Sequence, residues 1–453
     1  MKGQRLSTIA KILGSRIENE NYIEHLNDKY VEHFEFDSRK LVQNSLFFAL
    51  KGEKFDGHDF LREAAEKKAA GAVVSRDYQG NPFGLSLIRV DDVVGSLQDL
   101  AKEALSKRTL KIVGITGSVG KTTTKEFVAT LLSARFRIGK IPGNRNTQVS
   151  FPTSILNHLN GEEEVFVAEM GISLPGEMAN LVDIAPPDIV LINKIAFSHA
   201  EFFVDGIRGI AREKGEILSH FKTKHAIIHN QAFSFEEISK RVPRSTSTFG
   251  LDPSLDYCVH FVEEGIIIKE KNGFSTRVFT LPFQASHLCE NFLGAAVVAR
   301  NLGMEWEEII KQSAHLKTYI HRFDKVEKKG ITFIDDCYNA NPESMKAALQ
   351  NLPKPSQGGK TVAVLGAMKE LGKYSEDFHR EIGKCALDAV DHLLCFGKEC
   401  LPMTDVFTKE GRPVDHFPDL SSLREKLQNV MQPGDVVLIK GSNSLQMWRL
   451  LED

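Results

Sequence analysis

"LKIVGITGSVGKTTTKEFVATLLSA", residues 110–134, is the most informative segment of the chain. Its first part is apolar and predicts a buried strand, and the part that begins at Lys121 predicts a helix. Between them lie Gly117 and Gly120, whose backbone freedom lets several N–H groups converge on an anion at the helix N-terminus. Lys121 adds a cation, and Thr122 adds a hydroxyl of the kind that binds magnesium. The stretch therefore predicts a phosphate-binding loop.

The glycine spacing of this loop departs from the standard pattern. The motif places a glycine five residues before the glycine that precedes the lysine. Here that position is Ile115, and Gly114 comes one residue too early. A glycine-rich turn with a chance lysine is the alternative, but the strand before it and the helix after it favour nucleotide binding. The residues expected to hold the phosphates are Gly117, Ser118, Val119, Gly120, Lys121, Thr122 and Thr123.

The composition excludes several classes of protein. The chain has 453 residues, enough for roughly two to four domains. A net charge of −3 gives no reason to expect a nucleic-acid partner. Six cysteines without CxxC spacing indicate reduced thiols rather than zinc ligands or disulfides. No leader and no membrane-spanning stretch is recognisable, so we expect a soluble, cytoplasmic protein without membrane insertion.

The order of the predicted elements indicates an α/β protein with three domains. Residues 1–108 mix short strands and helices and predict a small α/β domain. Strand-like runs alternate with helices over 109–318, which predicts a P-loop ATP-binding domain with a mostly parallel sheet. Within it, 250–285 predicts β-hairpins. Residues 319–453 alternate in the same way and predict a doubly wound, Rossmann-like domain.

Three further residues of the central domain could carry chemistry. Glu169 ends the predicted strand of "VFVAEMG", where a carboxylate could hold Mg²⁺. His199 follows another predicted strand, although the pattern alone favours an ordinary loop histidine. Lys214 lies in "GIAREKGEIL", and the spacing alone favours a solvated helix charge paired with Glu213 or Glu216.

Two other motifs each allow a simpler interpretation. "NKIA", residues 193–196, is similar to the NKxD motif that recognises guanine, but Ala196 replaces the required carboxylate, so guanine specificity is not expected. "FIDDCYNANPESMKAAL", residues 333–349, places Asp335 and Asp336 at a strand end. These acids could bind a ribose hydroxyl or a metal, or could simply satisfy backbone groups where the helix begins.

The motifs taken together resemble those of the ATP-dependent muramyl peptide ligases. The resemblance is carried by "GITGSVGKTTTKE", "EMG", "SHAEFF…AREKGEI" and "DDCYNANPESM…VLGAMKELG", and it extends to "DSRKLVQNSLFFALKGEKFDGHDF" in the first domain. The displaced glycine of the phosphate loop is typical of this family. The "YNANPES" loop is similar to the corresponding loop in the family members that add D-alanyl-D-alanine. The members that add the third amino acid usually have a DYAHTP-like loop instead.

The resemblance implies a reaction in peptidoglycan precursor synthesis. ATP would phosphorylate the carboxylate of a UDP-muramyl tripeptide, and the amine of D-Ala-D-Ala would attack the acyl phosphate to give an amide and phosphate. The partners implied are these small molecules, and we expect a monomer. The alternatives are a ligase that adds the third residue, a folylpolyglutamate synthetase, or a P-loop ATPase that acts as a conformational switch.

The resemblance also implies roles for individual residues. Lys121 and two Mg²⁺ ions would neutralise the phosphoryl group, with one ion on Thr122 and Glu169 and the other on His199 and a carbamate of Lys214. Carbamylation would turn an ammonium into an oxygen ligand suited to a hard cation. The remaining assignments are Asn291 to adenine, Arg322 to the phosphates, Asp336 to the ribose, Ser38 and Arg39 to the UDP site, and Asn144, Asn146 and Thr147 to the sugar-peptide substrate. Thr147, Ser150, Lys194 and Ala196 depart from the family pattern.

Overall fold

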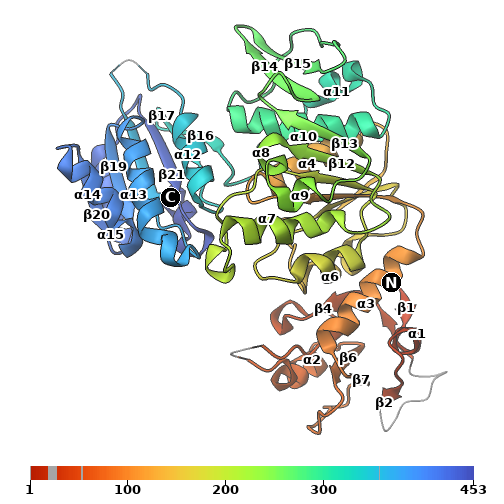
Figure 1. The fold of residues 1–453 in the computed structure, drawn as a ribbon. Helices are drawn as coiled ribbons and strands as arrows, with labels where there is room; N and C mark the ends of the chain where they lie inside the picture. The colour runs from red at the N-terminus through yellow and green to blue at the C-terminus, as the bar shows by residue number, and fades with distance from the viewer. Residues whose placement is uncertain (1, 19–27, 53–54, 357, 453) are drawn as a thin grey trace.

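The computed structural model describes residues 2–18, 28–52, 55–356 and 358–452. Three sheets follow one another along the chain, and Figure 1 shows them as three bodies, with the middle one in contact with both others. The α/β class with three domains is therefore confirmed. The boundaries at 108/109 and 318/319 stay predictions. No helix of these described ranges is long and apolar enough to cross a membrane.

The N-terminal part holds a five-stranded sheet in the order β2-β7-β6-β5-β4, parallel except for β2. A separate two-stranded ribbon pairs β1 with β3. The strands are β1 (Gln4–Arg5), β2 (Ile17–Glu18), β3 (Tyr30–Val31), β4 (His33–Glu35), β5 (Ser45–Phe48), β6 (Gly71–Ser75) and β7 (Leu87–Val90). The helices are α1 (Leu6–Ile12), α2 (Leu61–Glu66) and α3 (Val93–Ser106), with short 3₁₀ turns η1 (Ser38–Lys40) and η2 (Gly57–Phe60).

The middle part is built on an eight-stranded sheet in the order β15-β14-β13-β12-β11-β8-β10-β9. Only β15 runs antiparallel, and with β14 it forms the predicted hairpin at the edge of the sheet. The strands are β8 (Lys111–Thr116), β9 (Ile138–Lys140), β10 (Val165–Glu169), β11 (Ile189–Ile192), β12 (His225–His229), β13 (Ser245–Gly250), β14 (Tyr257–Val262) and β15 (Gly265–Glu270). The helices are α4 (Lys121–Leu132), α5 (Ser150–His158), α6 (Glu177–Ile184), α7 (Ile207–Gly215), α8 (Asn230–Phe233), α9 (Glu236–Ser239), α10 (Ser286–Asn301) and α11 (Trp306–Ser313), with 3₁₀ turns η3 (Ala200–Phe202) and η4 (Glu216–Leu218).

Helices cover both faces of the middle sheet, which explains its nearly continuous apolar strands. Ile112 of β8 faces the core shared with α5, α6 and α7, whereas Val113 and Ile115 face the core shared with α4 and α10. The central strands therefore end in a row, and the loops that follow them meet at one edge of the sheet.

The C-terminal part has a six-stranded sheet in the order β16-β17-β21-β18-β19-β20, parallel except for β16. The strands are β16 (Asp324–Lys328), β17 (Ile331–Asp335), β18 (Thr361–Gly366), β19 (His392–Phe396), β20 (Val414–Phe417) and β21 (Val436–Lys440). The helices are α12 (Pro342–Gln350), α13 (Ser375–Leu387), α14 (Leu401–Lys409) and α15 (Leu420–Val430), with 3₁₀ turns η5 (Gly372–Tyr374), η6 (Lys398–Cys400), η7 (Asn443–Leu445) and η8 (Met447–Leu451). Helices again cover both faces, as the doubly wound prediction requires.

Candidate active site

The predicted phosphate loop connects β8 to α4 in the expected geometry. Gly117 and Gly120 have φ angles of 141° and 83°, which side chains rarely adopt. A Cβ on Gly120 would lie 2.4 Å from the amide oxygen of Asn291, and one on Gly117 would lie 2.8 Å from Cβ of Asn193. The backbone angle therefore favours glycine at both positions, and at Gly117 the close approach of Asn193 leaves no room for a side chain. The loop lies directly at the N-terminus of α4.

Lys121 and Thr122 begin α4 and face the same site. The Lys121 ammonium donates a hydrogen bond of 2.8 Å to the carbonyl of Gly117, and burial lowers its pKa. The Thr122 hydroxyl accepts a bond of 3.3 Å from the guanidinium of Arg322, which precedes the C-terminal sheet. The phosphate loop is thus joined to the C-terminal part of the chain by a cation predicted to reach the phosphates.

Glu169 lies at the end of β10 and is almost completely buried. One carboxylate oxygen accepts a bond of 2.8 Å from the side chain of Asn146, which fixes part of the predicted substrate loop beside it. The other oxygen lies 3.7 Å from Nζ of the buried Lys125 and has no hydrogen-bond partner. A buried carboxylate oxygen without a donor is suited to a hard cation.

The structure overturns the solvated-helix reading of Lys214. The residue is 1% exposed, although it lies on the helix predicted from the sequence. Glu213 instead accepts bonds of 2.9 Å from the backbone of Gly176 and Met178 at the start of α6, and Glu216 pairs with Arg241. Burial lowers the pKa of Lys214 well below its usual value, and the charge of Lys121 acts in the same direction.

His199 contacts the C-terminal part of the chain. It precedes η3 with a left-handed φ of 55°, and its buried Nδ1 lies close to the Glu370 carboxylate, without a hydrogen bond of regular geometry. The proximity of this ring lowers the pKa of Glu370. The histidine is therefore held by a specific partner, unlike an ordinary loop histidine.

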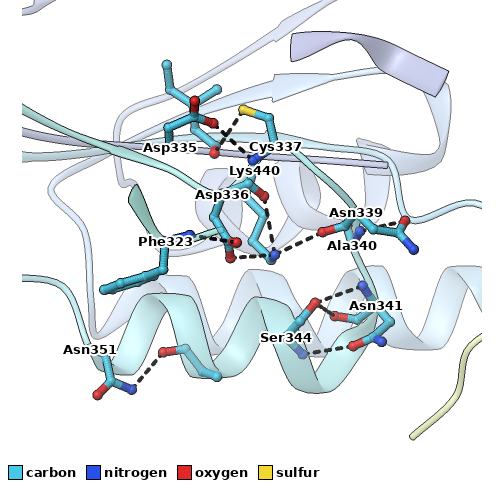
Figure 2. A network of polar contacts seen from close by, with 12 residues as sticks. Phe323, Asp335, Asp336, Cys337, Asn339, Ala340, Asn341, Ser344, Asn351 and Lys440 are labelled. Atoms are coloured by element: carbon cyan, nitrogen blue, oxygen red, sulfur yellow. Dashed lines mark hydrogen bonds and ion pairs between the residues drawn. The ribbon is translucent and has the colours of Figure 1, made fainter. Parts of the chain in front are cut away.

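Asp336 lies in a buried network at the carboxyl end of the C-terminal sheet, which Figure 2 shows. Its carboxylate accepts a hydrogen bond of 2.6 Å from Nζ of Lys440 and one of 3.1 Å from the backbone N–H of Phe323. Lys440 also donates a hydrogen bond to the carbonyl of Asn339. Burial raises the pKa of Asp336, although the charge of Lys440 opposes the shift. Asp336 is thus fixed beside the loop that carries the "YNANPES" motif.

A cavity of about 310 Å³ unites most of these groups between the middle and C-terminal parts. The predicted residues that line it are Ser118, Val119, Gly120, Lys121, Thr122, Thr123, Asn144, Asn146, Thr147, Glu169, His199, Asn291, Arg322 and Asp336. Gly117 and Lys214 do not line it. Lys214 is buried close enough to Lys121 and Glu169 for their charges to influence it.

The two residues predicted for UDP lie apart from this cavity, in the N-terminal part. Arg39 is exposed and pairs with Asp37 over 2.8 Å. Ser38 is buried, and its carbonyl accepts a bond of 2.7 Å from Lys67. The structure therefore brings neither of them to the phosphate loop.

Several residues of the cavity were not predicted from the sequence. The ring of Tyr338 lies 3.7 Å from the guanidinium carbon of Arg322, and Lys440 fixes Asp336. Glu290 pairs with Lys194 over 2.5 Å and with His229 over 3.1 Å. Their positions in the sequence could have indicated two of them, because Tyr338 belongs to the "YNANPES" loop and Lys440 ends strand β21.

No group of three or more His, Cys, Asp or Glu side chains that could hold a metal occurs within the described ranges. This does not argue against magnesium, because Mg²⁺ usually takes one or two protein ligands together with water and substrate phosphates. The free oxygen of Glu169 and the hydroxyl of Thr122 are suited to that chemistry.

Family models match the chain in three consecutive segments. Residues 31–104 match the Mur ligase family catalytic domain, 115–299 match the Mur ligase middle domain, and 321–443 match the Mur ligase glutamate ligase domain. The second segment contains the phosphate loop, Glu169, His199 and Lys214, and the third contains Arg322 and Asp336.

Individual relatives cover nearly the full length. The UDP-N-acetylmuramoyl-tripeptide–D-alanyl-D-alanine ligase of Bacillus subtilis is 32% identical over 92% of this chain and 92% of its own length. The structure of the MurF ligase from Thermotoga maritima in complex with ADP is 33% identical, with a TM-score of 0.78 over 93% of this chain and 96% of that one. The structure of MurF from Acinetobacter baumannii is 27% identical, with a TM-score of 0.86 over 100% of this chain and 99% of that one. Because the three domain matches and these relatives agree, the chain belongs to the Mur ligase family.

Proposed function

We propose that the protein is an ATP-dependent ligase that joins D-alanyl-D-alanine to a UDP-N-acetylmuramoyl-tripeptide in peptidoglycan precursor synthesis. The relatives from B. subtilis and T. maritima support this assignment by name. The observation that carries it is the shared cavity, where the phosphate loop meets loop 144–147 and the loop 338–341. A ligase needs such a junction, because the phosphoryl donor and two acceptors must meet in one place.

The chemistry requires charge neutralisation more than covalent help from the protein. The tripeptide carboxylate attacks the γ-phosphorus of ATP, the bond to ADP breaks, and an acyl phosphate forms. The dipeptide amine then attacks the acyl carbon, loses a proton and expels phosphate. Lys121 and Arg322 are placed to neutralise the transferring group, and the Lys121 ammonium would exchange its bond to Gly117 for one to a phosphate oxygen.

Magnesium would supply further neutralisation when bound. We assign one ion to Thr122 and Glu169 and a second to His199 and a carbamate on Lys214. The depressed pKa of Lys214 supports the carbamate, because only a neutral amine reacts with CO₂ and burial favours the neutral form. The carbamate would replace a buried cation by an oxygen ligand.

The remaining contacts are proposed from the family resemblance. Asn291, which lines the cavity beside Gly120, would contact adenine, and Asp336 would contact the ribose. The other assignments are Ser38 and Arg39 to UDP, and Asn144, Asn146 and Thr147 to the muramyl peptide. We further propose a monomer that works in the cytoplasm, where both nucleotide substrates are found.

The test is phosphate release from ATP by the purified full chain. Release should require the UDP-muramyl tripeptide and D-Ala-D-Ala together, and should fall to background when either is omitted. Turnover with a folate would favour a folylpolyglutamate synthetase, and turnover with a single amino acid and a dipeptide nucleotide would favour the third-residue ligase. Equal release with neither acceptor would favour an ATPase switch.

A further inference from the structure

The contact between His199 and Glu370 lies where the middle and C-terminal parts of the chain meet. Glu370 belongs to the loop between β18 and η5, far from His199 in the sequence. Both residues have left-handed backbone angles, with φ of 55° for His199 and 63° for Glu370. Such angles are rare in residues other than glycine and persist only where the surroundings enforce them. The contact between the two side chains is thus held by an enforced backbone geometry on both sides.

The two loops are held together by more than this pair. The backbone N–H of Glu201 donates a hydrogen bond of 3.2 Å to the carbonyl of Glu370. A Cβ on Gly372 would lie 3.0 Å from Cβ of Glu201, so these two segments of the chain approach as closely as a glycine allows. Phe197 packs on Tyr374, with ring centroids 5.1 Å apart. These contacts form a seam that fixes Glu370 against His199.

Glu370 contacts the histidine from outside the cavity, and its side chain is 47% exposed. His199 lines the cavity, whereas Glu370 is absent from its wall. Because Nδ1 faces the Glu370 carboxylate, the other ring nitrogen, Nε2, is the atom left for a ligand. Histidines that bind metals commonly donate their second nitrogen to a carboxylate, which fixes the tautomer and the ring orientation.

We propose that Glu370 is a positioning residue that orients His199 as a ligand of the second magnesium ion and makes that site depend on the seam between the two domains. The proposal rests on the proposed function in that it takes His199 as a metal ligand. It implies that separating the C-terminal domain from the middle domain weakens metal binding as well as nucleotide contacts. The second ion would then bind tightly only to the closed chain.

The test measures metal binding by the full chain without any turnover. Mn²⁺ is titrated, with electron paramagnetic resonance as the readout, in the presence of an ATP analogue that cannot be hydrolysed. Glu370→Ala should weaken one of two Mn²⁺ sites by about 10- to 100-fold. Glu370→Gln keeps an acceptor without the charge and should lie between Glu370→Ala and the unmodified chain.

Glu399→Gln is the matched control. It removes a carboxylate from a pair of 2.5 Å with Lys369, next to Glu370 in the chain, without touching the middle domain. Its Mn²⁺ affinity should be unchanged. Nitrogen-15 spectra of the metal-free chain should show His199 protonated on Nδ1, and Glu370→Ala should leave a mixture of tautomers.

Three results would overturn the proposal. They are unchanged Mn²⁺ binding in Glu370→Ala, an equal loss in Glu399→Gln, and a single Mn²⁺ site in the unmodified chain. A raised KM for the dipeptide with unchanged Mn²⁺ affinity would instead make Glu370 a binding group for the incoming amine. If amide formation fails while the Mn²⁺ difference persists, the proposed function is wrong and the role of Glu370 stands.

Discussion

Replacing Lys440 by methionine should destabilise the C-terminal domain selectively. The side chain of Lys440 is 2% exposed and that of Asp336 is 14% exposed, so the pair drawn in Figure 2 is largely buried. Removing one partner of a buried pair costs about 3–5 kcal/mol, because the other charge is left without compensation. Since Asp336 keeps the bond from the backbone of Phe323, we expect the lower end, about 3 kcal/mol.

Hydrogen exchange followed by mass spectrometry separates the three domains and is therefore the appropriate assay. Peptides from β17 and β21 should exchange faster in Lys440→Met, whereas peptides from β8 and β10 should not change. The double variant Asp336→Asn, Lys440→Met should recover most of the loss, because no unpaired charge remains. Lys240→Met, which breaks an exposed pair with Glu236, should leave exchange unchanged. Unchanged exchange in Lys440→Met would show that the pair of Lys440 and Asp336 does not stabilise this domain.

Three further predictions concern turnover. Lys121→Ala should lower kcat on the order of 10²-fold or more while the UDP-muramyl tripeptide still binds; retained activity would show that the loop is not the phosphate site. Lys214→Ala and Lys214→Arg should both lose activity with the fold intact, and formate should partly restore only the alanine variant; near-normal turnover of Lys214→Ala without formate would exclude the carbamate. ATP should be strongly preferred over GTP, because Ala196 lacks the guanine-reading carboxylate, and comparable kcat/KM values would contradict this.

Local sequence patterns were sufficient for the fold of the middle domain. The strand, the glycine loop and the helix of 110–134 are consecutive, so their geometry depends mainly on neighbouring residues. The displaced glycine has a simple explanation, because Gly114 lies inside β8, where a Cβ would approach Cβ of Pro187 to 3.0 Å. The parallel sheet followed from apolar strands that alternate with helices.

The burial of Lys214 could not be predicted in the same way. Its helix is amphipathic, and the neighbouring carboxylates of Glu213 and Glu216 are typical of a charged, solvated helix face. The structure assigns those carboxylates to α6 and to Arg241 instead, which are contacts between distant segments. Only the family resemblance indicated that this lysine differs from a surface charge.

The partners of the site residues were likewise beyond local patterns. Lys440 lies about a hundred residues from Asp336, and Glu370 is similarly remote from His199. Such pairs depend on how the domains fold and meet, and a single sequence carries no record of that contact. Strand-end positions predicted where functional residues gather, but not which of them would touch.

We propose that ATP activates the tripeptide by forming an acyl phosphate, and an oxygen label can follow this step. A UDP-muramyl tripeptide with ¹⁸O at both oxygens of its terminal carboxylate is incubated with ATP and D-Ala-D-Ala. Each released phosphate should contain one ¹⁸O from that carboxylate, with one amide formed per phosphate. Phosphate without ¹⁸O, in which water supplied the oxygen added to the γ-phosphoryl group, would show hydrolysis without activation and would contradict the acyl-phosphate mechanism.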